Sequence, residues 1–430
     1  MASSRDFITS FLTINKYRKL ERAFSRTRKI PFSNLVILLL QKSLKSLQIK
    51  LNEFADLVGI EPATASAFTQ ARALLSHELF KDLNSLIYSK DYYEQENYKT
   101  YKGHRLLAID GSYIRLPKSK AIEETYGKIT LKNQHQVNSY TGGLCSALYD
   151  VLNEIVISAE LANSLTAERT LAEHHFDHTK VGDIVVLDRG YPGYKFFAVM
   201  LSKKLHFICR CGGNMFADYH SLFVKDKNQD ELIVEMLPHR LRASDIADGF
   251  QKSLRVRLVK VVLNSGEIEV LATSLLDQEK YPKRDFKDLY SKRWGIETLY
   301  DRVKNRLSLE NFSGKSVEAV KQDFYSTIFI TNVEVDVTTE ANRQLKIKCD
   351  IKANQYQQKV NRSTSFNGIK RYAVDLFLES EKSVEDVVEE LGKLFRASTI
   401  PIRPGRKFPR KKGCPRMAVN YLKYSKKMIF

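Results

Sequence analysis

Three acidic residues occur where the chain could bring carboxylates together. Asp110 ends the apolar run HRLLAID, Asp188 ends the apolar run GDIVVLD, and Glu297 lies in the segment 285–307. Carboxylates that converge from separate elements are costly unless a cation neutralises them. Hard oxygen ligands with open positions favour Mg²⁺ or Mn²⁺, and two such ions about 3.5–4 Å apart can support phosphodiester chemistry. Either aspartate taken alone would more often be a turn residue.

The segment 285–307, DFKDLYSKRWGIETLYDRVKNRL, predicts one helix because it lacks proline and opens with an acidic N-cap candidate. At about 100° per residue, a carboxylate, two cations and a phenol fall in one narrow stripe. These residues are Tyr290, Arg293, Glu297 and Lys304. Such a stripe suits an ion held against a phosphate chain, although a solvated helix face with i,i+4 ion pairs is the alternative. Asp301, one turn beyond Glu297, is the one rival for the third metal ligand.

The elements around the two aspartates predict a mixed α/β architecture. The expected order is a strand over 104–110, two strands within 136–160, a helix, a strand over 184–187, a helix and a strand over 206–213. We expect each aspartate to lie at the end of its strand, where the chain turns. Residues 213–280 are predicted to form a β-rich insertion with a hairpin around Asn264–Gly266.

Residues 1–100 are predicted to be helical, and residues 51–75 have helix-turn-helix spacing, with Gly59 at the turn. The second helix of this pair could expose Gln70 and Arg72 to a DNA groove. Ordinary packing of two helices is the alternative, and the sequence leaves both open. Ala55 is the small residue expected where the two helices cross. The expected interior positions are Val58, Ile60, Ala65 and Phe68.

The charge balance indicates a polyanionic partner. The 430 residues carry a formal net charge of +19, and Arg403–Lys427 contains ten lysines and arginines without an acid. That tail is predicted to become ordered only against a polyanion. The longest purely apolar run is far below the ~20 residues that span a bilayer, so no membrane segment is expected. Five scattered cysteines without a paired motif fit a reducing cytoplasm.

Three blocks of residues carry a family resemblance. DGS at 110–112, DRGY at 188–191 and the spacing Tyr-x2-Arg-x3-Glu-x6-Lys resemble the signature of DDE transposases, and more narrowly of the bacterial insertion-sequence family numbered four. The resemblance implies an RNase H-like core, a β-rich insertion before its final helix, and helical N-terminal and C-terminal regions. The expected segments are 1–100, 101–212, 213–280, 281–345 and 346–430.

The resemblance also implies roles for residues and partners. Asp110, Asp188 and Glu297 would be catalytic and bind Mg²⁺ or Mn²⁺, as two ions, and the signature spacing favours Glu297 over Asp301. Tyr290, Arg293 and Lys304 would hold phosphates at the transposon end, with Arg189 and Tyr191 as further DNA-binding candidates.

The implied function is cut-and-paste transposition in a prokaryotic cytoplasm, close to the nucleoid. Its partners would be double-stranded DNA, namely terminal inverted repeats and target DNA, and the protein would assemble on it as a dimer. The two alternatives are an RNase H-like nuclease without strand transfer and a catalytically inactive DNA-binding regulator. Three intact carboxylates argue against the inactive regulator.

Overall fold

The computed structural model divides the chain into two compact units. The first unit combines Met1–Lys90, Arg115–Gly142 and the chain from Asp301 onward, and the second combines Asp91–Ile114 with Gly143–Tyr300. The structure describes residues 2–26, 28–95, 97–133, 136–212, 216–226, 228–238, 252–263, 265–378 and 381–403. The basic tail that the sequence singles out lies almost entirely outside these described residues, as does Asn264 of the predicted hairpin.

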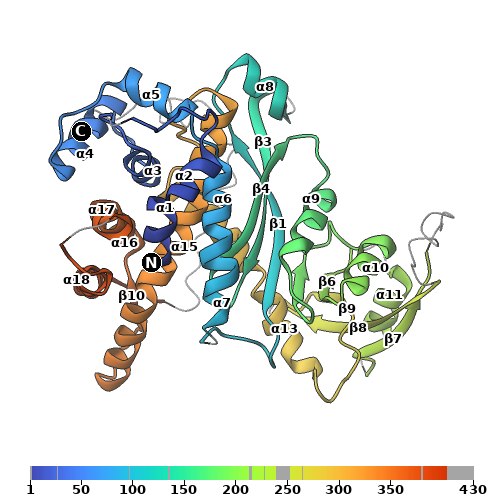
Figure 1. Ribbon diagram of the computed structural model, residues 1–430. Coiled ribbons are helices and arrows are strands. Elements are labelled where there is room, and N and C mark those ends of the chain that lie inside the picture. Colours follow the sequence, from blue (N-terminus) through green and yellow to red (C-terminus); the bar gives the residue numbers. More distant parts are fainter. Residues whose placement is uncertain are drawn as a thin grey trace. The chain divides into compact units, whose positions relative to one another are not determined.

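A mixed sheet forms the framework of the second unit (Figure 1). The strand order is β2-β3-β1-β5-β6-β9-β8-β7, with β4 paired to β3. Strands β1, β5 and β6 run parallel, whereas β3–β4 and β6–β9–β8–β7 are antiparallel. The strands are β1 Leu106–Arg115, β2 Lys128–Asn133, β3 Gln136–Asp150, β4 Ile155–Asn163, β5 Ile184–Leu187, β6 His206–Arg210, β7 Glu231–Met236, β8 Leu254–Val262 and β9 Ile268–Thr273.

Both faces of the parallel strands are buried, which explains their continuous apolar sequences. Leu107 and Val185 face one core, which also contains residues of α9, α10 and α11. Leu106 and Val186 alternate with them and face a second core that contains α13. The helices of this unit are α7 Tyr92–Glu94, α9 Glu168–His175, the 3-10 turn η2 Phe176–His178, α10 Tyr194–Ser202, α11 Ala217–Lys225, α13 Lys283–Ser291 and α14 Trp294–Asp301.

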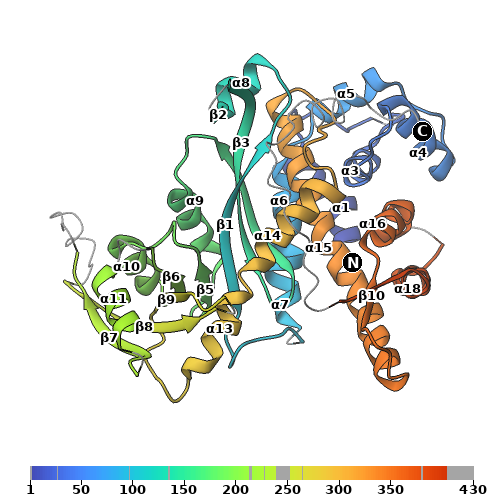
Figure 2. The same ribbon diagram turned by 180° about the vertical axis from the view of Figure 1, so that it is seen from behind.

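The first unit is mainly helical and centres on α15, a helix of 35 residues that is largely buried. Helices α3, α5, α6, α16 and α18 pack against it (Figure 2). The helices of the unit are α1 Ala2–Thr9, α2 Phe11–Tyr17, α3 Phe32–Leu40, α4 Leu47–Val58, α5 Ala65–Ala73, α6 Glu78–Asn84, the π-helix η1 Ser85–Asp91, α8 Lys120–Tyr126, the π-helix η3 Arg302–Arg306, α15 Val317–Ile351, α16 Arg362–Arg371, α17 Ala373–Phe377 and α18 Val384–Ala397. A short ladder pairs β10 Gln358–Val360 with β11 Thr399–Pro401.

The predicted fold class is confirmed: a mixed sheet of the RNase H-like kind, with three antiparallel strands followed by two parallel ones, and helical N-terminal and C-terminal regions. The stretch predicted as an insertion is β-rich as expected. Its strands β7, β8 and β9 extend the same sheet, because β9 pairs with β6. No helix among the described residues is long and apolar enough to cross a membrane.

The prediction of one continuous helix over 285–307 is wrong. Helix α13 ends at Ser291, α14 begins at Trp294, and the chain then continues as the π-helix η3. A π-helix has a longer repeat than 3.6 residues per turn, so the calculated stripe does not extend to Lys304.

The helix-turn-helix spacing is confirmed as local structure. Helices α4 and α5 flank Gly59, whose φ of 68° is in the left-handed region that glycine favours. Ala55 and Phe68 are buried as expected, but Ile60 is 40% exposed, against the prediction.

Candidate active site

Asp110 lies within β1 rather than at its end, because the strand continues through Gly111 to Arg115. The expected turn after Asp110 is therefore wrong. The Asp110 carboxylate accepts a hydrogen bond from the Gly111 backbone N–H at 2.9 Å. The Tyr300 hydroxyl of α14 donates to the Asp110 carbonyl at 2.7 Å and so ties this strand to the helix of Glu297. Burial raises the pKa of the Asp110 carboxyl to about 6.

Asp188 follows the last residue of β5, as predicted. Its Oδ1 atom lies 3.3 Å from the Tyr290 hydroxyl, which donates to it, and 3.2 Å from Nε of Arg210 on the neighbouring strand β6. Burial opposes ionisation, but the Arg189 backbone N–H and the positive charges of Arg293 and Arg210 outweigh it and lower the pKa of Asp188. The surroundings of Asp188 therefore favour its ionised form.

Glu297 lies in the first turn of α14 and is half-exposed. Its Oε1 atom accepts a hydrogen bond from Nη2 of Arg293 at 2.9 Å. The Arg293 side chain is only 5% exposed, and its Nε has no hydrogen-bond partner among the described residues. The guanidinium also lies 5.0 Å from the ring centre of Trp294, itself 50% exposed.

Arg293 is the cation that the three carboxylates share. It pairs with Glu297 directly, and its positive charge helps to lower the pKa of Asp188 and partly offsets the rise that burial gives the pKa of Asp110. The structure thus brings the three predicted carboxylates into one electrostatic neighbourhood of the second unit. Among the described residues, no group of three His, Cys, Asp or Glu side chains lies close enough together to hold an ion.

The donor set fits a hard divalent cation. Its side chains are oxygen ligands, which Mg²⁺ and Mn²⁺ prefer. The like charge of Glu297 opposes ionisation of Asp110, and a bound cation would relieve that cost.

One acidic residue of this neighbourhood escapes the sequence analysis. Glu168 opens α9, and its carboxyl group lies against Gly111: a Cβ atom added at Gly111 would lie 3.0 Å from Glu168 Cδ. A side chain at position 111 would therefore displace the Glu168 carboxyl group. The signal in the sequence is the glycine that directly follows Asp110, since a glycine inside a strand often marks a close approach.

The neighbouring Arg169 holds the loop that follows Asp188. Its guanidinium donates to the Gly190 carbonyl at 3.1 Å and to the Pro192 carbonyl at 2.8 Å. The first turn of α9 therefore contacts both aspartate-bearing segments, with Glu168 beside Asp110 and Arg169 across the Asp188 loop.

The predicted DNA-binding residues differ in how far they are exposed to solvent. Arg189 and Gln70 are exposed and stay predicted contacts. Tyr191 is 1% exposed within the core, so the prediction that it contacts DNA directly is wrong for this conformation. Burial, together with the negative charges of Asp110 and other acids, raises the pKa of its hydroxyl.

The prediction for Arg72 is also wrong. The side chain is 5% exposed and forms an ion pair with Asp323 of α15 at 2.7 Å. It also donates to Gln322 and to the Ala319 carbonyl. Four hydrogen-bond partners on or beside α15 make Arg72 a packing residue, which explains why it points away from solvent.

Two further residues from the sequence analysis lie in η3 and at the end of α14. Lys304 belongs to η3, in the first unit, and stays a predicted phosphate contact. Asp301, the rival of Glu297, is exposed, and its carboxylate accepts a hydrogen bond from the Asn305 amide at 2.6 Å. Asp301 thus has a local partner of its own.

Comparison with known proteins gives the class of protein to which the chain belongs. The profile of the family described as Transposase DDE domain matches residues 101–333, and the chain belongs to this family. It is a DNA transposase, an enzyme of metal-dependent phosphodiester chemistry.

Among individual proteins, the chain is similar to the transposase InsG for insertion sequence element IS4 of Escherichia coli (strain K12). The two are 21% identical over 357 residues, which cover 82% of this chain and 78% of that protein. This similarity agrees with the insertion-sequence family predicted from the three blocks. The piggyBac transposase synaptic complex with hairpin DNA covers 94% of this chain and 86% of its own, at 10% identity and a TM-score of 0.44 that is too low for a conclusion.

Proposed function

We propose that this transposase cleaves DNA at the ends of its own transposable element and joins the freed ends to target DNA. The catalytic ligands would be Asp110, Asp188 and Glu297, holding two Mg²⁺ or Mn²⁺ ions. The observation that carries this proposal is the shared cation: Arg293 pairs with Glu297 and acts on the charges of both aspartates. When bound, the ions would supply an activated water or 3′-hydroxyl and stabilise the leaving oxygen.

The chain's own residues orient the ligands before any ion or DNA binds. Tyr290 and Arg210 contact the same Asp188 oxygen and fix the direction of that carboxylate. Tyr300 fixes the strand of Asp110, and Arg293 holds Glu297. Such preorganisation lowers the reorganisation needed when the reacting phosphate arrives.

The DNA contacts are proposed on charge and exposure. Exposed Arg189 follows Asp188 directly and would contact a phosphate next to the reacting one. Lys304, Gln70 and the basic residues after Ile402 would add contacts to the phosphate backbone, which would position the duplex without selecting its sequence. We further propose that two copies act together on a pair of ends.

Cleavage of a duplex that carries the inverted repeats flanking the gene tests this function. We expect nicking that requires Mg²⁺ or Mn²⁺, followed by joining of the cut end to a second duplex. Cleavage without joining would support the nuclease alternative. Specific binding without cleavage under any metal would support the inactive regulator.

A further inference from the structure

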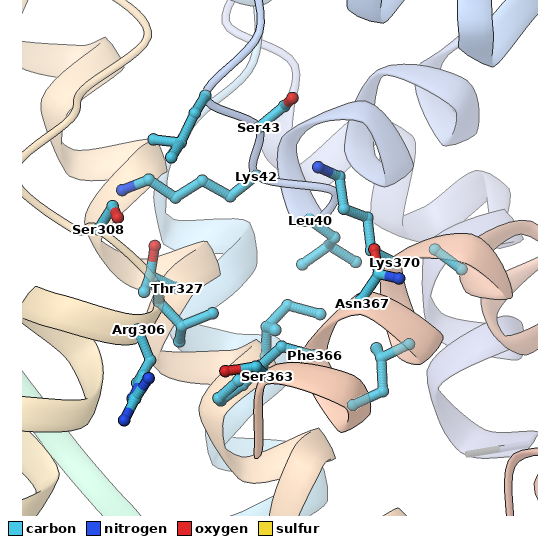
Figure 3. Close-up of a pocket in the computed structure, with 15 residues that line it drawn as sticks. Leu40, Lys42, Ser43, Arg306, Ser308, Thr327, Ser363, Phe366, Asn367 and Lys370 are labelled. Carbon is cyan, nitrogen blue, oxygen red and sulfur yellow. The ribbon is translucent and has the colours of Figure 1, made fainter. Parts of the chain in front are cut away.

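The first unit contains a cavity of about 240 Å³ beside α15 and α16 (Figure 3). A cavity needs only ~10–15 Å³ of such volume to hold one water molecule, so this one has room for a much larger group. The residues that line it come from the end of α3, the end of η3, α15 and α16. They are Leu40, Lys42, Ser43, Leu44, Arg306, Leu307, Ser308, Thr327, Ile330, Ser363, Phe366, Asn367, Ile369, Lys370 and Ala373.

The charge of the cavity wall has one sign. Three of the lining residues are cations: Lys42 follows α3, Arg306 ends η3 and Lys370 lies in α16. None of the described lining residues is acidic. In Figure 3, Lys42 and Lys370 lie at the upper side and Arg306 at the lower left. Burial lowers the pKa of Lys42 to about 8, although nearby acids oppose it, and burial also lowers the pKa of Lys370. An anion in the cavity would relieve this cost.

The backbone at the cavity edge is strained. The π-helix η3 ends at Arg306, and Ser308 has a φ of 49°, a left-handed value that residues other than glycine rarely adopt. Arg306 and Ser308 both line the cavity. Strained residues and π-turns persist where the surrounding structure over-determines them, and they are concentrated at functional sites.

The remaining wall contains hydroxyl groups, apolar groups and the amide of Asn367. Ser43, Ser308 and Ser363 supply hydroxyl groups, whereas Phe366 and Leu44 supply apolar surface. A ligand that combines an anionic oxygen group with a less polar part would match both. A phosphate with its attached sugar has this composition.

We propose that this cavity binds a backbone phosphate of DNA, with Lys42, Arg306 and Lys370 as its cationic contacts. The inference rests on the proposed function only in taking DNA as the source of the phosphate. The site belongs to the first unit and supplies none of the catalytic carboxylates, so it would anchor the duplex rather than react with it.

Lysine acetylation of the full-length protein tests the site without requiring cleavage. Acetic anhydride labelling, read by mass spectrometry in EDTA, compares free protein with protein bound to a short duplex. We expect the duplex to protect Lys370, whereas Lys346, an exposed lysine of α15, serves as the control. Equal labelling of Lys370 with and without duplex would overturn the proposal. Protection by inorganic phosphate alone, with none by duplex, would also overturn the assignment to DNA.

A charge-matched pair of variants gives the second measurement. Lys370→Gln should weaken duplex binding about tenfold and reduce the magnitude of the salt slope by about 0.9, as expected for one lost phosphate contact. Lys346→Gln removes the same charge outside the cavity and should leave both values near wild type. Wild-type affinity and salt slope in Lys370→Gln would contradict the proposal. Because the measurement is made without metal, a protein that fails to cleave ends can still show this binding, so the two proposals fail separately.

Discussion

Arg293 Nη2 and Glu297 Oε1 lie 2.9 Å apart, although Arg293 sits in the break between α13 and α14 and Glu297 in the first turn of α14. The break allows the arginine to be buried while its partner stays half-exposed. The pair therefore joins a fixed cation to a carboxylate that faces outward, where a metal ion and DNA can reach it.

Arg293→Lys keeps the positive charge and loses the planar fork of the guanidinium. We expect the single-turnover cleavage rate to fall about tenfold while the salt slope of DNA binding is unchanged, because the change misplaces Glu297 rather than removing a phosphate contact. Lys292→Arg, one residue earlier, is the control and should cleave normally. Normal cleavage by Arg293→Lys would make the pair an ordinary surface ion pair.

Substitutions can distinguish the three proposed metal ligands from Asp301, the alternative third ligand. Asp110→Asn, Asp188→Asn and Glu297→Gln should each reduce cleavage below detection and leave end binding nearly intact, because they remove ion ligands and spare the DNA contacts. Asp301→Asn should change cleavage little, since Asp301 bonds to Asn305. If Asp301→Asn were inactive and Glu297→Gln were active, Asp301 rather than Glu297 would be the third metal ligand.

Glu168 offers a fourth test at the same site. If its carboxyl group helps to hold an ion beside Asp110, Glu168→Gln should raise the Mn²⁺ concentration needed for half-maximal cleavage. It should also reduce the increase in melting temperature that Mn²⁺ gives the wild-type protein. Glu173→Gln, an exposed acid on the same helix, is the control. If the metal dependence were unchanged in both measurements, Glu168 would have no part in holding the ion.

The sequence predicted most strands of the sheet, and its family signature singled out three acids that lie in the same unit. Buried parallel strands have long apolar runs, and a family signature with fixed spacing ties distant residues to one site. It was not sufficient for the break at Arg293 or for the π-helix η3, because both depend on how α14 packs rather than on the residues that form it. Helical periodicity assumes 3.6 residues per turn throughout, and Lys304 was assigned to the stripe on that assumption.

The sequence also did not predict which polar side chains are buried against a partner. Arg72 and Gln70 are two residues apart on α5. The Arg72 side chain points into the interior because Asp323 lies there, 251 positions further along the chain. A helical pattern predicts which residues share a face, and it does not reveal a buried partner for one charged member. Glu168 was missed for the same reason, since its neighbour Gly111 is on another element.

The pKa of Asp110 predicts a pH dependence for the metal-free protein. Burial raises this pKa to about 6 in the folded state, above its ordinary value of 3.8, so the folded protein binds the proton more tightly than the unfolded one. The ionised carboxylate thus costs stability that appears as the pH rises above about 4 and is complete above about 6. Asp110→Asn should therefore raise the free energy of unfolding by about 3 kcal/mol at about pH 7.5 and change it little at about pH 4.

Urea unfolding in EDTA at the two pH values checks this expectation. A saturating concentration of Mn²⁺ should reverse the order at the higher pH, because only the wild-type carboxylate binds the ion. An Asn variant that is less stable than wild type at both pH values would contradict the assigned direction.

Arg72 predicts a loss of stability rather than of DNA affinity. Arg72→Gln leaves the buried Asp323 carboxylate without its cation and should lower the free energy of unfolding by about 3–5 kcal/mol. Gln70→Ala, an exposed change on the same helix, should stay within about 0.5 kcal/mol of wild type. Thermal unfolding of both variants gives the comparison. A stable Arg72→Gln protein with reduced DNA affinity would restore Arg72 as a DNA contact.

The two units are each assembled from separate stretches of chain, and this has a consequence for how the protein is made. Helices α3, α5 and α6 are among the first elements to leave the ribosome, yet they pack against α15, which begins at Val317. The first unit therefore cannot close its core until most of the polypeptide has been synthesised. Its contacts are distant in sequence, which favours slow folding and leaves apolar helices exposed on the nascent chain. A prematurely terminated chain would lack α15, so it would be a substrate for chaperones and proteases rather than a smaller active enzyme.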